Sequence, residues 1–146
     1  MDMLTEADKS VLNEVYRNSR VGMKAINSVI GKVYDDDLAL DLNRLAYQYA
    51  RISEKAAGKL YENGLKPQED GPLNRAVMWG SIQLNTLTDI STEHIAELMI
   101  QGSTRGMTEM TKVAKENNAC GKFSSEMAEE LIHFEEKSIQ RLKAYL

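Results

Sequence analysis

The sequence has few of the residues that mark common binding sites or other fold classes. Its single cysteine, Cys120, excludes an internal disulfide and a cysteine-based metal cluster. Only two prolines and two phenylalanines occur, while strong helix formers such as Leu, Ala, Glu and Lys dominate. No apolar run approaches the ~18 residues of a membrane span, and the polar, acidic N-terminal residues do not resemble a signal peptide. We therefore expect a helical, cytoplasmic protein without membrane insertion.

Positive charge is also scarce. Eighteen Lys and Arg stand against 22 Asp and Glu, so the formal net charge is −4. No basic stripe alternates with aromatic residues, and we therefore expect no nucleic-acid partner. A Gly-rich phosphate loop and a readable Ser-His-Asp order are both absent. The length of 146 residues fits one domain spanning 1–146.

Apolar residues recur at helical spacing in four long segments. These segments cover residues 5–33, 37–62, 91–117 and 124–146. A shorter helix is expected at 72–88, and a single continuous helix over 72–117 is the alternative interpretation. Four amphipathic helices joined by short loops predict an all-α fold, an antiparallel four-helix bundle with a short additional helix.

Local signals set the ends of these helices. Thr5 followed by Asp8 is a variant of the capping box, and Ser91 is a good N-cap. Asn63-Gly64 is a strong C-terminal stop for the second helix. We expect Ser124 or Ser125 to cap the last helix.

The helix that begins after Ser91 has two glycines on its predicted inner face. Gly102 and Gly106 leave a groove, and each costs roughly 1 kcal/mol relative to alanine in a helix interior. Close approach of a neighbouring helix is the favoured explanation, and a bound ligand is the alternative. Glu109 is placed on the same face, so this groove lies beside a candidate buried acid.

The two histidines raise the question of a metal site. Di-iron bundles place Glu on two helices and Glu-x-x-His on the other two, all pointing inward. The last helix contains Glu130 and His133 in this order, and the helix after Ser91 contains His94 and Glu97 in reverse. On a wheel of 100° per residue, both pairs fall at the edge or on the outer face of their helix. Metal ligands are therefore not expected there, and a surface salt bridge or a solvated face is favoured for Glu130 and His133.

Other polar residues near the apolar stripes are few. Asp41 and Glu109 are the remaining acidic candidates for a metal site, besides Asp8 near a terminus. Tyr16 and Tyr49 are predicted mid-bundle, where they could hydrogen-bond Glu109 or Ser19, since a buried polar group needs a partner. A satisfied core network is favoured over the remnant of a ligand-binding centre.

The short segment at 72–88 carries the best candidate for an interface. Trp79 and Met78 would form an apolar anchor, because large aromatic residues on an appended helix often mark a contact surface. Packing as a lid over one end of the bundle is the alternative. Cys120 follows a helix C-terminus, where the macrodipole raises the pKa of a thiol, so we expect no nucleophile there.

The order of these parts resembles the bacterial ferritin-like four-helix bundles of unknown function, which are related to rubrerythrins. The resemblance is carried by Leu12-Asn13-Glu14, the Asn63-Gly64 loop, the segment from Arg75 to Gly80, the helix containing Gly102, and Ile139 to Leu142. It implies a ferritin-like bundle, dimeric or otherwise associated, with no established activity. Working sites in that superfamily need Glu-x-x-His on the second helix, where this chain has Tyr49 to Glu54 without it.

Two interpretations follow from these observations. The leading one is a non-catalytic, metal-free ferritin-like module that binds or associates with a partner, as a homodimer or with another protein. The alternative is a divergent di-iron-type oxidoreductase or iron-handling protein that binds iron or manganese. Its ligands would come from Glu109, Asp41, His94, Glu130 and His133.

Overall fold

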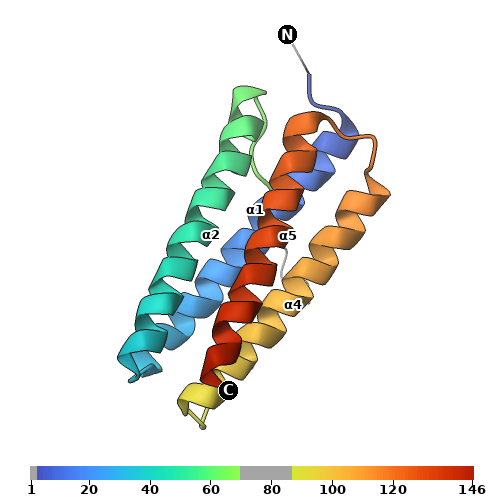
Figure 1. The fold of residues 1–146 in the computed structure, drawn as a ribbon. Helices are drawn as coiled ribbons and strands as arrows, with labels where there is room; N and C mark the ends of the chain where they lie inside the picture. Colours follow the sequence, from blue (N-terminus) through green and yellow to red (C-terminus); the bar gives the residue numbers. More distant parts are fainter. Residues whose placement is uncertain (1–2, 70–86) are drawn as a thin grey trace.

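The computed structural model describes residues 3–69 and 87–146, and the regular structure in these ranges is entirely helical (Figure 1). Four long helices dominate, as the periodicity predicts, and two short 3-10 helices extend two of them. The elements are α1 (Glu6–Val29), η1 (Ile30–Lys32), α2 (Asp36–Glu62), α4 (Thr92–Glu116), α5 (Lys122–Leu142) and η2 (Lys143–Tyr145). Residues 87–91 are not helical, so the interpretation of 72–117 as one continuous helix is wrong. The rest of the expected helix at 72–88, with Trp79 and Met78, lies outside the described residues.

Contacts between helix ends define how the four helices lie together. Asp8 at the start of α1 contacts Gly121 at the start of α5. Asp41 near the start of α2 contacts Arg141 at the end of α5. In Figure 1 the chain passes down α1 and back up α2, then up α4 and down α5. α2 therefore ends at the opposite end of the bundle from the start of α4.

The predicted N-caps of α1 and α4 are confirmed, and a further acidic side chain caps α2. Thr5 and Asp8 form a reciprocal capping box on α1, Asp35 caps α2, and Ser91 caps α4. Gly64, at a φ of 71°, ends α2 in the left-handed conformation that glycine adopts without strain.

The expected cap of α5 by Ser124 or Ser125 is wrong. The N-cap is Gly121, and Ser124 lies buried within the first turn. Asp8 Oδ1 accepts hydrogen bonds from the Gly121 amide at 2.7 Å and from the Ser124 hydroxyl at 2.8 Å. A carboxylate from α1 thus satisfies the N-terminus of α5, and a local capping side chain is unnecessary.

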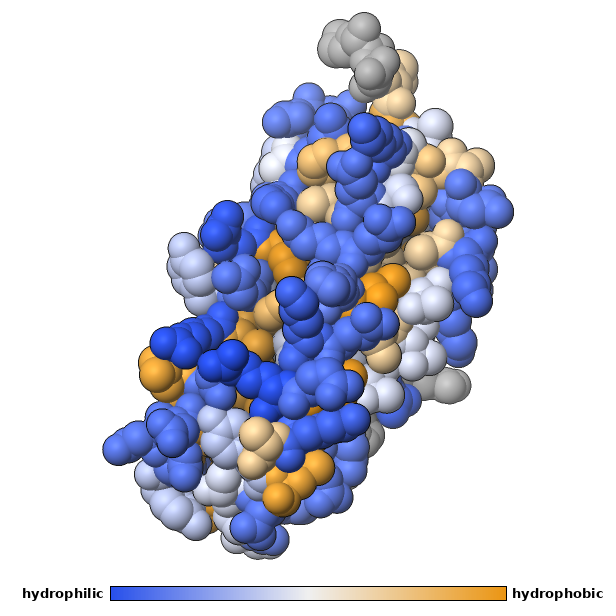
Figure 2. Space-filling view, viewed as in Figure 1, coloured by the Kyte–Doolittle hydropathy of each residue, from blue (hydrophilic) through white to orange (hydrophobic). Residues whose placement is uncertain are grey.

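The core is a single cluster of aliphatic side chains from all four long helices. Its fully buried members are Val11, Leu12, Val15, Val29, Leu38, Leu42, Ala56, Leu60, Ile95, Met110, Leu131 and Leu142. Their complete removal from water supplies the main driving force for folding. The face shown in Figure 2 is mostly hydrophilic, as expected for the outer sides of amphipathic helices. Within the described ranges, no helix has the length and apolar character needed to span a bilayer.

Candidate functional site

The interior contains a polar centre formed by Glu135 of α5 and Tyr49 of α2. Glu135 is 1% exposed and Tyr49 is 4% exposed. The Tyr49 hydroxyl donates a hydrogen bond to Glu135 Oε2 at 3.2 Å. Tyr49 also packs edge-on against Phe134, with the ring centroids 4.8 Å apart. This pair, called the Glu135–Tyr49 centre below, joins two helices across the bundle.

Two glycines make room for the centre. A Cβ at Gly22 of α1 would lie 2.5 Å from the Tyr49 ring, and a Cβ at Gly106 of α4 would lie 2.5 Å from Glu135 Oε2. Both distances are far shorter than carbon atoms tolerate, so any side chain at either position would displace its neighbour. Gly106 therefore serves close contact between α4 and α5. Gly102, the other predicted groove residue, is half-buried.

The α1 side of the centre is polar as well. Asn18 donates to the Gly106 carbonyl at 2.8 Å and to Glu14 Oε2 at 3.3 Å. Glu14 also approaches Arg17, with a nitrogen–oxygen distance of 3.4 Å. The side chain of Glu14 is only 17% exposed. Hydrogen bonding to Asn18 keeps this carboxylate against the bundle.

Burial shifts the proton equilibria of the centre. Desolvation raises the pKa of Glu135 from 4.5 to about 8, with the nearby charge of Glu14 acting in the same direction and the hydrogen bond from Tyr49 opposing them. Burial, followed by the charge of Glu135, also raises the pKa of Tyr49 well above its usual value. Near neutral pH the centre is therefore a protonated carboxyl beside a neutral phenol.

Three buried side-chain oxygen atoms have no hydrogen-bond partner among the described residues. They are Glu135 Oε1, the Ser19 hydroxyl and Glu130 Oε2. An unpaired buried polar atom costs about 1–3 kcal/mol, and a protonated carboxyl lowers this cost because it carries no net charge. The neutral form of Glu135 is thus the form that the interior accommodates.

Sequence reasoning missed Glu135, although the signal was present. Counting 100° per residue from Leu131, Glu135 falls at roughly +40°, well inside the apolar stripe of α5. It lies four residues after Leu131 and seven before Leu142, and all three are fully buried. The wheel that defines the apolar stripe of α5 therefore also places this carboxyl in the core.

The prediction that Glu109 faces the interior is wrong. Its side chain is 49% exposed and lies 3.9 Å from Lys112. The buried face of α4 is centred on Met99, Ser103 and Met110. The predicted stripe is centred on Ile95, several tens of degrees around the helix from this observed buried face. Glu109 lies on the side of Ile95 away from the buried face and is therefore turned towards solvent.

The tyrosine predictions are partly confirmed. Tyr49 lies mid-bundle, but its partner is Glu135 instead of Glu109. Tyr16 is half-buried, and its hydroxyl donates to Glu69 at 2.9 Å, in the segment that follows α2. The shared network between the two tyrosines therefore does not form, since their hydroxyls point to different neighbours.

The remaining candidate ligands are spread over the molecule. Asp41 is buried, and it accepts hydrogen bonds from Arg141 at 2.8 Å and Tyr145 at 2.6 Å. Glu130 pairs with Lys55 at 2.9 Å, as the salt-bridge interpretation predicts. His94 is half-buried on α4, and His133 is exposed on α5.

These positions do not match the donor set of a di-iron site. Among the residues that the structure describes, no three His, Cys, Asp or Glu side chains come together as potential metal ligands. The most deeply buried carboxyl of the described bundle, Glu135, accepts a hydrogen bond from the Tyr49 phenol. Iron or manganese requires deprotonated carboxylates, usually with imidazole, converging on one point. The residues of this interior do not fit such a group.

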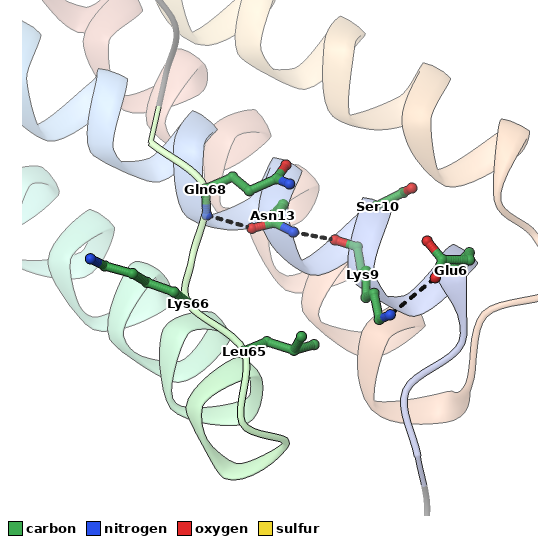
Figure 3. Close-up of a pocket in the computed structure, with 7 residues that line it drawn as sticks. All are labelled: Glu6, Lys9, Ser10, Asn13, Leu65, Lys66 and Gln68. Carbon is green, nitrogen blue, oxygen red and sulfur yellow. Dashed lines mark hydrogen bonds and ion pairs between the residues drawn. The ribbon is translucent and has the colours of Figure 1, made fainter.

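A small surface pocket lies apart from the centre, near the N-terminal end of α1 (Figure 3). It encloses about 180 Å³ where the chain after α2 lies against α1. The Gln68 amide donates to Asn13 Oδ1 at 2.8 Å, and Lys9 pairs with Glu6 at 3.0 Å. The pocket contains none of the predicted site residues.

Cys120 lies near the N-terminus of α5 and is half-buried. Burial, followed by the negative charge of Asp8, raises the pKa of its thiol. A raised pKa reduces the thiolate fraction at neutral pH, which disfavours a nucleophile as the sequence predicts.

Comparison with protein-family models and with curated proteins finds no match for this chain.

Proposed function

We propose that this protein is a non-catalytic, metal-free ferritin-like bundle that acts as a binding or interaction module. The observation that carries the proposal is the Glu135–Tyr49 centre. It occupies the bundle interior with direct contacts between helices, at the depth where ferritin-like metal proteins hold their ligands. The interior then serves stability, and recognition is left to the outer helix faces.

Two features support the ferritin-like assignment. The helices form two pairs joined by one long connection, which is the topology that ferritin-like folds use. On α5, the buried Glu135 is followed three residues later by the buried Ser138, where a metal site of this class would have histidine. The Ser138 hydroxyl donates to the Phe134 carbonyl of its own helix. A Glu-x-x-Ser pattern retains the inward acid and lacks the imidazole.

Metal analysis of the purified protein tests the metal-free assignment. We expect no stoichiometric iron or manganese, and no change in Tm when Fe(II), Mn(II) or Zn(II) is added. Any ligand that binds the native state must raise its stability by mass action. A stoichiometric metal content, or a rise in Tm that saturates at one or two metal ions per chain, would overturn the proposal.

One observation favours the alternative, a divergent metal-binding oxidoreductase or iron-handling protein. Carboxyls from α1 and α5 border the same position, since a Cβ at Gly106 would lie 2.5 Å from Glu135 Oε2 and 2.7 Å from Asn18 Oδ1, and Asn18 donates to Glu14. A metal ion could replace the proton if both carboxyls ionised. In that case the Glu14→Gln and Glu135→Gln variants would each abolish the metal-dependent rise in Tm, and Glu136→Gln would not.

A further inference from the structure

The outer face of α2 carries large side chains that the bundle does not cover. Leu40 is 50% exposed, Tyr47 63% and Tyr61 62%. With the exposed Glu54, these residues are spaced seven apart, so they form one line along the helix. The line spans about 32 Å from end to end at 1.5 Å per residue. Three large exposed leucine and tyrosine side chains in one row are unusual on a surface helix, where polar residues are expected.

Small and charged residues complete this face. Gly58 lies on it, and a Cβ there would meet nothing within 4 Å. Arg44 and Arg51 flank the line and are exposed. Together with Leu40, Tyr47, Glu54 and Tyr61 they occupy an arc of roughly 100° on the helical wheel. We call these seven residues the α2 outer face. Within the described part of the chain, no ion pair joins Arg51 or Glu54 to a neighbour.

The order of residues makes this face complementary to itself. In an antiparallel helix pair, opposing residues have numbers with a constant sum. With the two-fold axis between positions 52 and 53, Arg51 lies opposite Glu54 of the second copy, and Glu54 lies opposite Arg51. Tyr47 then lies opposite Gly58, where the missing side chain leaves room for a ring. Arg44 lies opposite Tyr61, a pairing that suits a cation–π contact.

We propose that the α2 outer face binds a second copy of this chain in an antiparallel, two-fold symmetric dimer. A symmetric contact must be self-complementary, and this face supplies two ion pairs, two ring-on-glycine contacts and two cation–π contacts from one helix. Close packing of two helices needs axes about 8–10 Å apart, and glycine at position 58 permits this approach opposite a tyrosine. The proposal deepens the interaction role proposed above, because it names the partner and the surface.

The dimer should be weak. One helix face buries less than the ~800 Å² per partner of a standard stable interface. We therefore expect a dissociation constant in the micromolar range, about −8 kcal/mol or weaker. Sedimentation equilibrium of the full chain from about 10 μM to about 1 mM covers this range. A wild-type protein that stays monomeric throughout would overturn the proposal.

The Gly58→Leu variant tests the interface without disturbing the fold of the single chain. In the isolated bundle the new side chain meets open space, so Tm should stay equal or rise, because glycine is a poor helix former. In the dimer the leucine meets Tyr47 of the second copy, and association should weaken at least about tenfold. A dimer that is unaffected by Gly58→Leu would place the contact elsewhere and refute the proposed face.

A charge swap tests the register. Glu54→Arg and Arg51→Glu should each weaken the dimer at least about tenfold, since like charges then face each other at the axis. The double variant should restore it, because the exchanged charges again face opposite charges in the second copy. Glu136→Arg, an exposed reversal on α5, is the control and should leave association unchanged. Failure of the double variant to recover association would refute the register.

These outcomes are independent of the metal test. A monomeric protein without metal would sink the dimer while leaving the metal-free assignment standing. A dimeric protein with stoichiometric metal would support the dimer and overturn the metal-free assignment.

Discussion

Replacing Glu135 with glutamine should change how the stability of this protein depends on pH. In the unfolded chain the carboxyl ionises near pH 4.5, whereas in the folded protein its pKa is about 8. Between these values the folded state holds a proton that the unfolded state has released. The free energy of unfolding therefore falls as pH rises through this window, and the loss is complete above about pH 8. Glutamine cannot ionise, so the free energy of unfolding of the variant does not fall through this titration.

The size of the effect follows from the shift. A rise in pKa from 4.5 to about 8 corresponds to roughly 5 kcal/mol at 1.36 kcal/mol per unit. Relaxation around an ionised Glu135 reduces this value, so we expect roughly 2–5 kcal/mol. At pH 4 both proteins hold a neutral side chain that can accept from Tyr49, and their stabilities should be similar. At pH 9 the Glu135→Gln variant should be more stable than the wild type by the full amount.

Urea unfolding followed by circular dichroism at pH values from 4 to 9 measures this difference. The matched control is Glu136→Gln, which removes an exposed carboxyl from the adjacent position of α5. Subtracting each variant from the wild type cancels the contributions of other titrating groups that do not interact with the mutated site. A stability difference between Glu135→Gln and the wild type that does not change with pH would refute the assignment of a buried, protonated Glu135.

Further predictions concern two glycines, the Tyr49 hydroxyl and the Asp8 carboxylate. Gly106→Ala should lower the free energy of unfolding by about 1–3 kcal/mol in urea, because the new methyl group would lie 2.5 Å from Glu135 Oε2. Gly58→Ala, with open space around it, should instead raise it by up to ~1 kcal/mol, and equal effects at both sites would contradict the packing. Tyr49→Phe removes the hydrogen bond that lowers the pKa of Glu135, so NMR titration should give a higher pKa than in the wild type; a lower value would argue against this contact. Asp8→Asn should destabilise the protein by about 1–2 kcal/mol at pH 7, because the Asp8 carboxylate accepts hydrogen bonds at the starts of both α1 and α5. These hydrogen bonds hold the pKa of Asp8 at about 2. Its contribution is present above pH 3.8 and is lost as pH falls through about 2, so a thermal unfolding difference that persists below pH 2 would contradict it.

Much of the fold is determined by local patterns in the sequence. Apolar spacing defines four long helices, because an amphipathic stripe must be buried against another element. The ends of the helices follow from residues a few positions apart, as at Thr5 with Asp8 and at Asn63-Gly64. Such signals act within one turn, so the sequence is enough to read them.

Only the tertiary structure decided which polar residues meet. Asp8 was read as a cap for its own helix, yet it also satisfies the start of α5, more than a hundred residues later in the chain. Glu109 is expected in the interior but is exposed, because the buried face of α4 is rotated from its predicted centre, and the buried acid is Glu135 of α5. A rotation of some tens of degrees leaves the apolar pattern intact and moves a carboxylate between solvent and core. That rotation is set by packing against neighbouring helices, through contacts such as Glu135 on Gly106 and Tyr49 on Gly22, which no single helix encodes.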